Sequence, residues 1–214
     1  MITGRPIRLC LDLNIWFAAE LATRRGVRGT ACEILATAVR DGYCAAGPVQ
    51  LITSIPVIEN WADVLRRRLN YTRAAAEEKA WILREFALQG PLEVAPQIVV
   101  GSGHVPFATE GDVRNAAQEH LKSGSGKLFD EIADDFHVLL AAIAGKADIL
   151  ATADIGDFAR GAAIRLVRDD VLLFPAGERM LVVAKPSFAA FWLRQGIVPD
   201  HDFVVANLDD FRRR

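Results

Sequence analysis

Acidic side chains stand at both ends of the most apolar segment of this sequence, ADDFHVLLAAIAGKADILATADIGDF, which covers residues 133–158. Asp134 and Asp135 precede its helical part, while Asp148, Asp154 and Asp157 lie around its strand-like end. Burying a carboxylate is costly unless the group is paired or binds a cation. The placement of these acids therefore points to a divalent metal, held where strand ends and helix ends meet.

The chain alternates between strand-like and helical segments. Short apolar runs predict strands that start at residue 7 and lie further on at 49–54, 148–153, 164–167 and 180–184. Helical spacing of apolar residues predicts helices at 14–25, 29–42, 55–69, 72–88, 112–122, 131–145 and 187–196. Such alternation predicts an α/β sandwich around a mainly parallel sheet.

Four acids that are distant in the sequence are predicted at one edge of this sheet. Asp12 ends the first strand, and Asp154 follows the strand at 148–153. Glu59 lies in the first turns of the helix after the second strand, and Asp135 begins the helix that leads into a later strand. Functional groups collect beyond the carboxyl ends of strands in open parallel sheets. We therefore expect these four carboxylates to converge.

A cluster of carboxylates has a specific chemical use. Carboxylates that lie close together repel one another unless a cation neutralises them. Oxygen ligands favour hard cations, here Mg²⁺ or Mn²⁺, which activate water and stabilise the oxyanions of phosphoryl displacement. Each acid also has a plainer interpretation. Asp12 caps the next helix and Glu59 is solvated, while Asp134 or Asp135 is an N-cap and Asp154 or Asp157 holds the turn.

The composition restricts the class of protein. A length of 214 residues suits one domain with an appendage, and 51% hydrophobic residues argue against disorder. No apolar run approaches the roughly 18 residues of a membrane span, and the N-terminal apolar part is too short for a signal peptide. Cys10, Cys32 and Cys44 form no CxxC pair, so we expect reduced thiols in a cytoplasmic protein with no membrane contact.

Arginines occur in clusters although the net charge is only −2. Such runs usually form a solvated face, but they also suit contacts with nucleic-acid phosphates. The candidates for contacts with the RNA backbone are Arg24, Arg25, Arg66, Arg67 and Arg68.

Three segments of the sequence resemble the PIN-domain family of metal-dependent ribonucleases. LCLDLNIWFAAEL resembles the opening of the family, in which a hydrophobic strand ends in Asp-x-Asn, here Asp12 and Asn14. IENWADVL resembles the segment that carries the acidic glutamate, here Glu59. DDFHVLLAAIAGKADILATADIGDF resembles the segment with an aspartate before an Ala-rich helix and a strand leading into Thr-x-Asp. The resemblance covers residues of about 7–167.

The resemblance implies a three-layer α/β/α sandwich and a Mg²⁺- or Mn²⁺-dependent endoribonuclease. Its catalytic and metal-binding residues would be Asp12, Glu59, Asp135 and Asp154, with Asp157 and Asp134 as further acids. Asn14 and Thr152 would orient the carboxylates or a water molecule. The partners implied are single-stranded or structured RNA, an antitoxin protein and a second copy of the chain. A toxin of a toxin–antitoxin pair and a processing nuclease both stay open.

The sequence departs from compact toxins of the family in its length. We expect one PIN-like domain over 1–196, an unmatched insertion at about 96–128, and a C-terminal appendage or tail over 197–214. An alternative is a catalytically inactive PIN-like module that binds RNA or a protein; the presence of all four matched acids argues against it. A haloacid-dehalogenase-like phosphatase also starts with a strand-end aspartate, but it needs a second acid where this chain has Asn14.

Overall fold

A computed structural model describes residues 6–88, 115, 136–159, 163–167, 170–176, 179–199 and 201–207. Asp134 and Asp135 lie outside the described residues. The same holds for the helix predicted at 112–122 and the insertion at about 96–128, apart from Asn115. The predictions for these segments therefore stay predictions.

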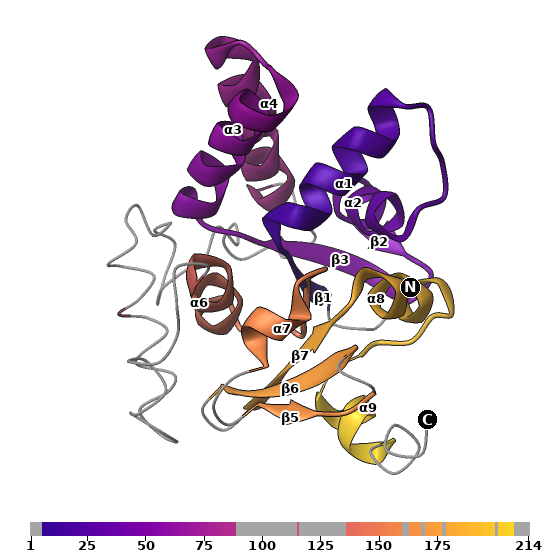
Figure 1. The fold of residues 1–214 in the computed structure, drawn as a ribbon. Coiled ribbons are helices and arrows are strands. Elements are labelled where there is room, and N and C mark those ends of the chain that lie inside the picture. The colour runs from indigo at the N-terminus through magenta and orange to yellow at the C-terminus, as the bar shows by residue number, and fades with distance from the viewer. Residues whose placement is uncertain are drawn as a thin grey trace.

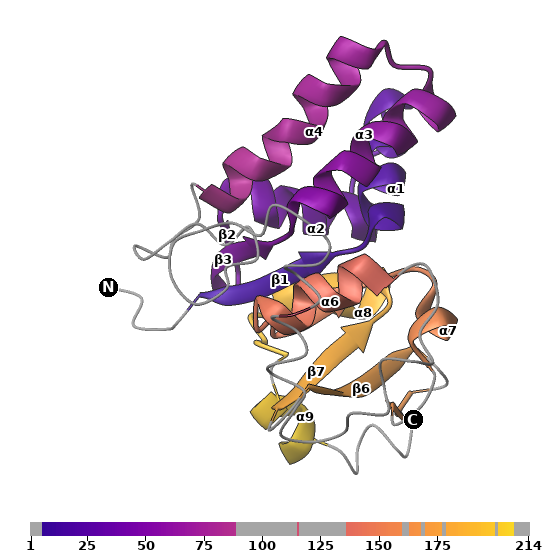
Figure 2. The same cartoon turned by 90° about the vertical axis from the view of Figure 1, so that its left-hand side faces the viewer.

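In the described part of the chain, seven strands form one mixed sheet (Figures 1 and 2). Their bounds are Ile7–Leu11 (β1), Tyr43–Cys44 (β2), Gly47–Ile52 (β3), Ile149–Ala151 (β4), Ile164–Arg165 (β5), Val171–Ala176 (β6) and Arg179–Ala184 (β7). The order is β2-β3-β1-β4-β7-β6-β5. The four central strands β3, β1, β4 and β7 all run parallel to one another. The predicted α/β class with a parallel centre is confirmed.

The edges of the sheet are antiparallel, which the sequence predictions missed. β2 pairs with β3, and β6 pairs with both β5 and β7. β6 begins with the continuous apolar run VLLF, whose four side chains are all buried. A short apolar run of this kind cannot be distinguished from a buried helical segment by periodicity alone.

The helices agree with the predicted ones to within a few residues at the ends that the structure describes; the predicted start of the helix at 131–145 lies outside the described residues. Their bounds are Leu13–Arg24 (α1), Ala31–Asp41 (α2), Ile55–Leu69 (α3), Arg73–Leu88 (α4), Phe136–Ala144 (α6), Ile155–Phe158 (α7), Pro186–Arg194 (α8) and His201–Ala206 (α9). The short helices α7 and α9 were not predicted. α9 lies in the predicted appendage, and its Val204 is fully buried in the core.

Two hydrophobic cores lie against the sheet, because successive strand side chains point to opposite faces. Leu9 and Leu11 pack in one core with α1, α2, α3, α4 and α8, whereas Cys10 packs in the other with α6 and α7. Figure 2 shows α6 and α8 overlapping, one in front of the strands and one behind them. At the end of α6, a Cβ on Gly145 would overlap the Ile52 side chain of β3, so only glycine fits there.

Asp148, one of the acids around the apolar segment, is a structural residue at the opposite edge of the sheet from Asp12. It directly precedes β4 and is 1% exposed. Its Oδ2 accepts a hydrogen bond of 2.9 Å from the backbone N–H of Arg8, at the start of β1. Its Oδ1 pairs with Nη2 of Arg179, in β7, at 3.2 Å. The carboxylate therefore ties three neighbouring strands together.

We expect Asp148→Ala to lower the free energy of unfolding by about 3 kcal/mol. The substitution leaves a strand N–H without its acceptor and removes the carboxylate partner of Arg179. Urea unfolding monitored by circular dichroism measures this change. Asp41→Ala is the control, because Asp41 forms an exposed pair with Arg40 and should cost less than about 1 kcal/mol. Equal losses in the two variants would contradict the structural role of Asp148.

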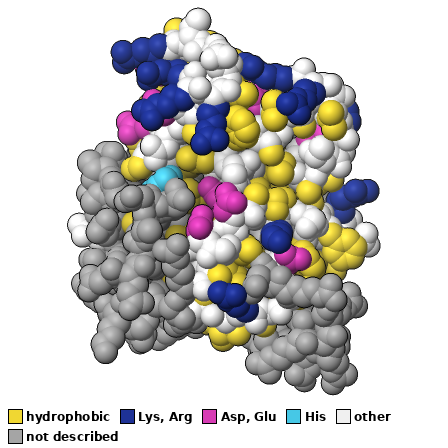
Figure 3. Space-filling model, viewed as in Figure 1, with side chains coloured by type: hydrophobic (Ala, Val, Ile, Leu, Met, Phe, Trp, Pro, Cys, Tyr) yellow, Lys and Arg dark blue, Asp and Glu magenta, His cyan; other side chains and the backbone are white. Residues whose placement is uncertain are grey.

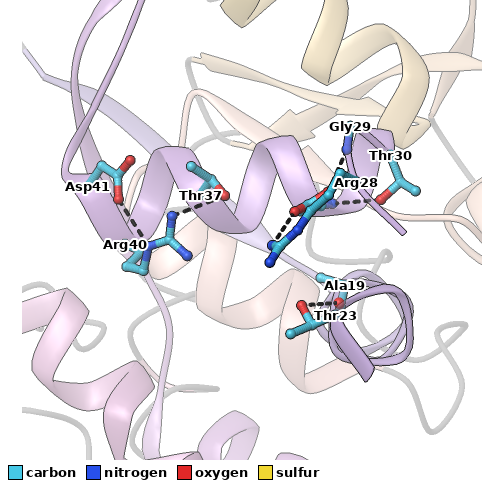
Figure 4. A network of polar contacts seen from close by, with 9 residues as sticks. Ala19, Thr23, Arg28, Gly29, Thr30, Thr37, Arg40 and Asp41 are labelled. Atoms are coloured by element: carbon cyan, nitrogen blue, oxygen red, sulfur yellow. Dashed lines mark hydrogen bonds and ion pairs between the residues drawn. The ribbon is translucent and has the colours of Figure 1, made fainter. Parts of the chain in front are cut away.

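Two side chains cap the N-terminus of α2: Thr30, which precedes the helix, and Glu33, which lies in its first turn. The Thr30 hydroxyl accepts a hydrogen bond from the backbone N–H of Glu33 at 3.1 Å. The Glu33 carboxylate in turn accepts from the backbone N–H of Gly29 at 2.6 Å and from the Arg28 guanidinium at 2.9 Å. Figure 4 shows Arg28, Gly29 and Thr30 gathered at this first turn. This reciprocal pattern is a capping box, and it fixes where α2 starts.

The capping box should make stability depend on pH. The hydrogen bond from Arg28, followed by that from Gly29, lowers the pKa of Glu33 below its ordinary value. A carboxyl group whose pKa is lower in the folded state stabilises the protein when the pH is above its unfolded-state pKa of about 4.3. This stabilisation is lost as the pH falls through the folded-state pKa. The melting temperature of Glu33→Gln should therefore lie below that of the wild type near neutral pH. The difference should shrink as the pH falls below about 4; a constant difference would contradict this.

Candidate metal centre

The pairing of β1 with β4 brings the first acid next to the Thr-x-Asp segment. The two strands are parallel neighbours, with Leu11 in register with Ala151. The backbone N–H of Asp12 donates to the carbonyl of Ala151 at 3.0 Å. Asp12 and Thr152 therefore leave the same edge of the sheet side by side.

Asp12 begins α1 as its N-cap residue. Its Oδ1 accepts a hydrogen bond of 2.6 Å from the backbone N–H of Leu13. A carboxylate is a favourable group at this position, because the first N–H groups of a helix lack partners and carry partial positive charge. The cap interpretation and the metal interpretation are compatible, since capping occupies only one side of one oxygen.

Asn14 and Thr152 connect the carboxylates of Asp12 and Asp154. The amide nitrogen of Asn14 donates to Oδ2 of Asp12 at 2.8 Å and to Oδ2 of Asp154 at 3.2 Å. The hydroxyl of Thr152 donates to Oδ2 of Asp12 at 2.6 Å and accepts from the backbone N–H of Asp154 at 3.1 Å. The amide oxygen of Asn14 accepts from the backbone N–H of Ala153 at 3.1 Å, which fixes the amide orientation. The two carboxylates thus share one amide donor.

Asp12 and Asp154 line a pocket of about 230 Å³. Asp154 and Asp157 are exposed on its wall, at the two ends of the turn that starts α7. Helices α1, α3 and α6 supply the rest of the wall. The lining side chains are Asp12, Leu13, Asn14, Phe17, Val64, Arg68, His137, Val138, Asp154, Asp157 and Phe158. Figure 3 shows acidic side chains gathered in the middle of this face, next to a histidine.

Glu59 does not line the pocket. It is exposed on α3, whereas Val64 and Arg68 of the same helix face the pocket. Asn60, Val64 and Arg68 are four residues apart and share one face of the helix, and Glu59 is turned from that face by roughly 100°. In this structure Glu59 is therefore separate from the pair formed by Asp12 and Asp154.

His137 is a pocket residue that the sequence reasoning missed. It lies in the first turn of α6, and its Nε2 is 3.3 Å from the amide nitrogen of Asn60 in α3. Its position two residues after Asp135 could have indicated it, because a residue near the start of that helix lies near the same edge of the sheet. The contact with Asn60 holds the start of α6 against α3.

The side chains present fit a hard divalent cation in their donor type. Asp12, Asp154 and Asp157 supply carboxylate oxygens to one pocket, and such oxygens are the ligands of Mg²⁺ and Mn²⁺. Among the described residues, however, no three His, Cys, Asp or Glu side chains are grouped closely enough to hold a metal ion. Asp135, the other predicted ligand of this edge, lies outside them. Two aspartates joined through Asn14 thus form the described part of the centre.

Cys10 lies two residues before Asp12, in the hydrophobic core under α6. It is 1% exposed, and its Sγ faces the carbonyl of Val138 at 3.8 Å in the core under α6. Burial raises the pKa of the Cys10 thiol far above its usual range, and the negative charge of Asp12 raises it further. The thiol therefore stays protonated and serves as a core residue.

Three of the five arginines predicted to contact RNA are paired with acids. Arg66 and Arg67 both bind the carboxylate of Asp63, each at 3.1 Å. Arg24 pairs with Glu20 at 3.5 Å, and its guanidinium covers the ring of Tyr71 at 4.3 Å. Arg25 is exposed at the end of α1, and Arg68 lines the pocket. In Figure 3, basic side chains lie above the acidic group, on the side of α3 and α4.

No family model and no curated protein sequence matches this chain. A function therefore has to be inferred from the chemistry of the site. Within the described residues, no helix combines the length and the apolar character that crossing a bilayer requires.

We expect Mg²⁺ or Mn²⁺ to raise the melting temperature of the wild-type protein. An ion that binds only the folded state stabilises it by about 2.7 kcal/mol at a concentration one hundred times its Kd. Asp154→Asn should lose most of this shift, because it removes a carboxylate of the pair. Asp63→Asn should keep it, because Asp63 pairs with Arg66 and Arg67 and does not line the pocket. Equal shifts in both variants would place the ion elsewhere.

Proposed function

We propose that this chain is a PIN-like endoribonuclease that depends on Mg²⁺ or Mn²⁺. The observation that carries the proposal is the junction of Asp12 and Asp154 through Asn14 and Thr152, at the carboxyl edge of two parallel strands. These are the positions at which the sequence resembles the family. The same residues open into one pocket, which gives a substrate access to them.

The packing of the chain supports the fold part of the proposal. Hydrophobic cores lie on both faces of the sheet, one under α1, α2, α3, α4 and α8 and the other under α6 and α7. We infer from them a three-layer α/β/α sandwich with a PIN-like centre. The antiparallel strands β2, β5 and β6 extend this centre at its edges.

The side chains of the site have separate roles in the proposed reaction. Asn14 and Thr152 hold the Asp12 carboxylate in one orientation, because both donate to its Oδ2. Asp12 and Asp154 would hold the metal ion, with Asp157 on the same wall and Asp135 as a further predicted ligand. A bound Mg²⁺ or Mn²⁺ supplies Lewis acidity and a water that is nucleophilic at neutral pH. Hydrolysis of an RNA phosphodiester is the reaction that this set of groups suits.

The biological role stays a prediction from the sequence. A toxin with an antitoxin partner and a processing nuclease use the same chemistry, and both are compatible with a homodimer. A PIN-like module that binds RNA or a protein without cutting is the alternative, and the experiment below separates it from the nuclease.

We expect the purified protein to cleave a labelled single-stranded RNA with Mn²⁺ or Mg²⁺ and to be inactive in EDTA. Asp12→Asn and Asp154→Asn should each lower the rate by more than about 100-fold, which exceeds the usual cost of losing a residue that only orients a ligand. Asp41→Asn should keep the wild-type rate, because Asp41 forms an exposed pair with Arg40 and does not line the pocket. Gel electrophoresis of the products under single-turnover conditions gives the rates.

Two outcomes would overturn this proposal. A folded wild-type protein that cuts no RNA with either metal would favour the binding module. Cleavage that persists unchanged in both aspartate variants would mean that the reaction, or a contaminating nuclease, uses other groups. Circular dichroism of each variant shows whether it is folded.

A further inference from the structure

Three successive arginines in α3 have different surroundings. Arg66 and Arg67 reach back to Asp63, which is three and four residues earlier on the helix, and each binds one of its oxygens at 3.1 Å. Residues at these spacings are neighbours on a helix surface. Arg68 is five residues from Asp63 and lies on another face of the helix. One carboxylate thus partly neutralises two of the three charges.

Arg68 projects its charge toward the pocket. It shares a helix face with Val64, and both side chains line the same pocket as Asp12 and Asp154. Within the described residues, no acidic side chain forms an ion pair with Arg68. The described lining of the pocket therefore combines carboxylates with a guanidinium that no described acidic side chain neutralises. Such a guanidinium is a fork of hydrogen-bond donors that matches the oxygens of a phosphate.

Apart from Asn14 and His137, the other described side chains that line the pocket are apolar. Phe17, Val64 and Phe158 face it, together with Leu13 and Val138. Its volume of about 230 Å³ is below the roughly 300–1,000 Å³ of pockets that enclose a drug-sized ligand. A space of this size and polarity suits one unit of a flexible strand, with sugar and base against the apolar side chains. In RNA, unpaired and unstacked nucleotides are the ones that can be splayed into a protein pocket.

We propose that Arg68 is the residue that holds a phosphate of an unpaired RNA nucleotide in this pocket, beside the pair of Asp12 and Asp154. Arg66 and Arg67 do not take part, because Asp63 binds both of them. The substrate class is therefore single-stranded RNA, because unpaired nucleotides are the ones that can be splayed into a pocket of this kind. This inference rests on the proposed function for its choice of RNA, and its test uses binding as well as cleavage.

The decisive measurement is the binding of a fluorescent single-stranded RNA in EDTA, followed by anisotropy, for wild type, Arg68→Ala and Arg67→Ala. The two variants remove the same charge from adjacent positions of one helix, and neither residue contributes to the core. We expect Arg68→Ala to weaken binding by about tenfold or more, as for the loss of a charged hydrogen bond. The slope of log Kd against log salt should fall by about 0.7, the value for one phosphate contact of a single strand. Arg67→Ala should change Kd less than about twofold.

Two further arms test the geometry and the substrate class. Arg68→Lys keeps the charge but loses the fork, and it should lie between the wild type and Arg68→Ala. A hairpin duplex of the same length should bind more weakly than the single strand, and its binding should not depend on Arg68.

The outcomes separate this inference from the proposed function. If the wild type cuts RNA while Arg68→Ala and Arg67→Ala bind it equally well, the inference is wrong and the nuclease stands. If the wild type cuts nothing but binds the single strand through Arg68, the inference stands and the nuclease fails. A wild type that binds neither RNA, or a duplex whose binding depends on Arg68, would overturn the inference.

Discussion

The register between β1 and β4 is the constraint on which the site depends. The two strands are adjacent and parallel, although about 140 residues separate them in the chain. Because both run in the same direction, their carboxyl ends meet at one edge, and Asp12 leaves that edge beside Thr152. A shift of one residue in this pairing would exchange the two faces of a strand and break the Thr152–Asp12 hydrogen bond. The polar centre is therefore positioned by the most apolar part of the protein, the strand residues Leu9, Leu11 and Ala151 in the core.

The acids around the apolar segment are stabilised in two different ways. At one edge of the sheet, Asp148 is buried and is matched by the backbone of β1 and by Arg179, so its charge is balanced within the protein. At the other edge, Asp12 and Asp154 share the single amide of Asn14, which carries no charge. A neutral bridge orients the two carboxylates but itself adds no positive charge. This difference gives Asp148 a structural role and makes the other edge suited to a cation.

The sequence predicted the centre of the fold better than its edges. The polar residues that follow β1 and β4, which are Asp12, Thr152 and Asp154, could be predicted from the sequence. A buried strand followed by a capped helix gives a strong local pattern. β6 was missed, because the run VLLF has no alternation and its identity as a strand comes from pairing with β7. The direction in which the Glu59 side chain points could not be predicted either. Each residue of a helix is turned by roughly 100° from the one before it, so Glu59 and Asn60 lie on different faces of α3. Asp134 and Asp135 stay predictions, because they lie outside the described residues.

The arginines of α3 show why a charge cluster in a sequence does not define a binding surface. Counting charges treats Arg66, Arg67 and Arg68 as equivalent, but helix geometry gives the first two a common partner in Asp63 and directs the third to the pocket. The partner costs the first two arginines part of their attraction for a phosphate, because a new contact has to replace an existing one. In the proposed complex, Arg68 would contact a phosphate without breaking an ion pair, and it lines the same pocket as Asp12 and Asp154. A pocket lined by both acids and a guanidinium would suit a metal ion and an anionic strand together, and this combination suits the proposed phosphodiester hydrolysis.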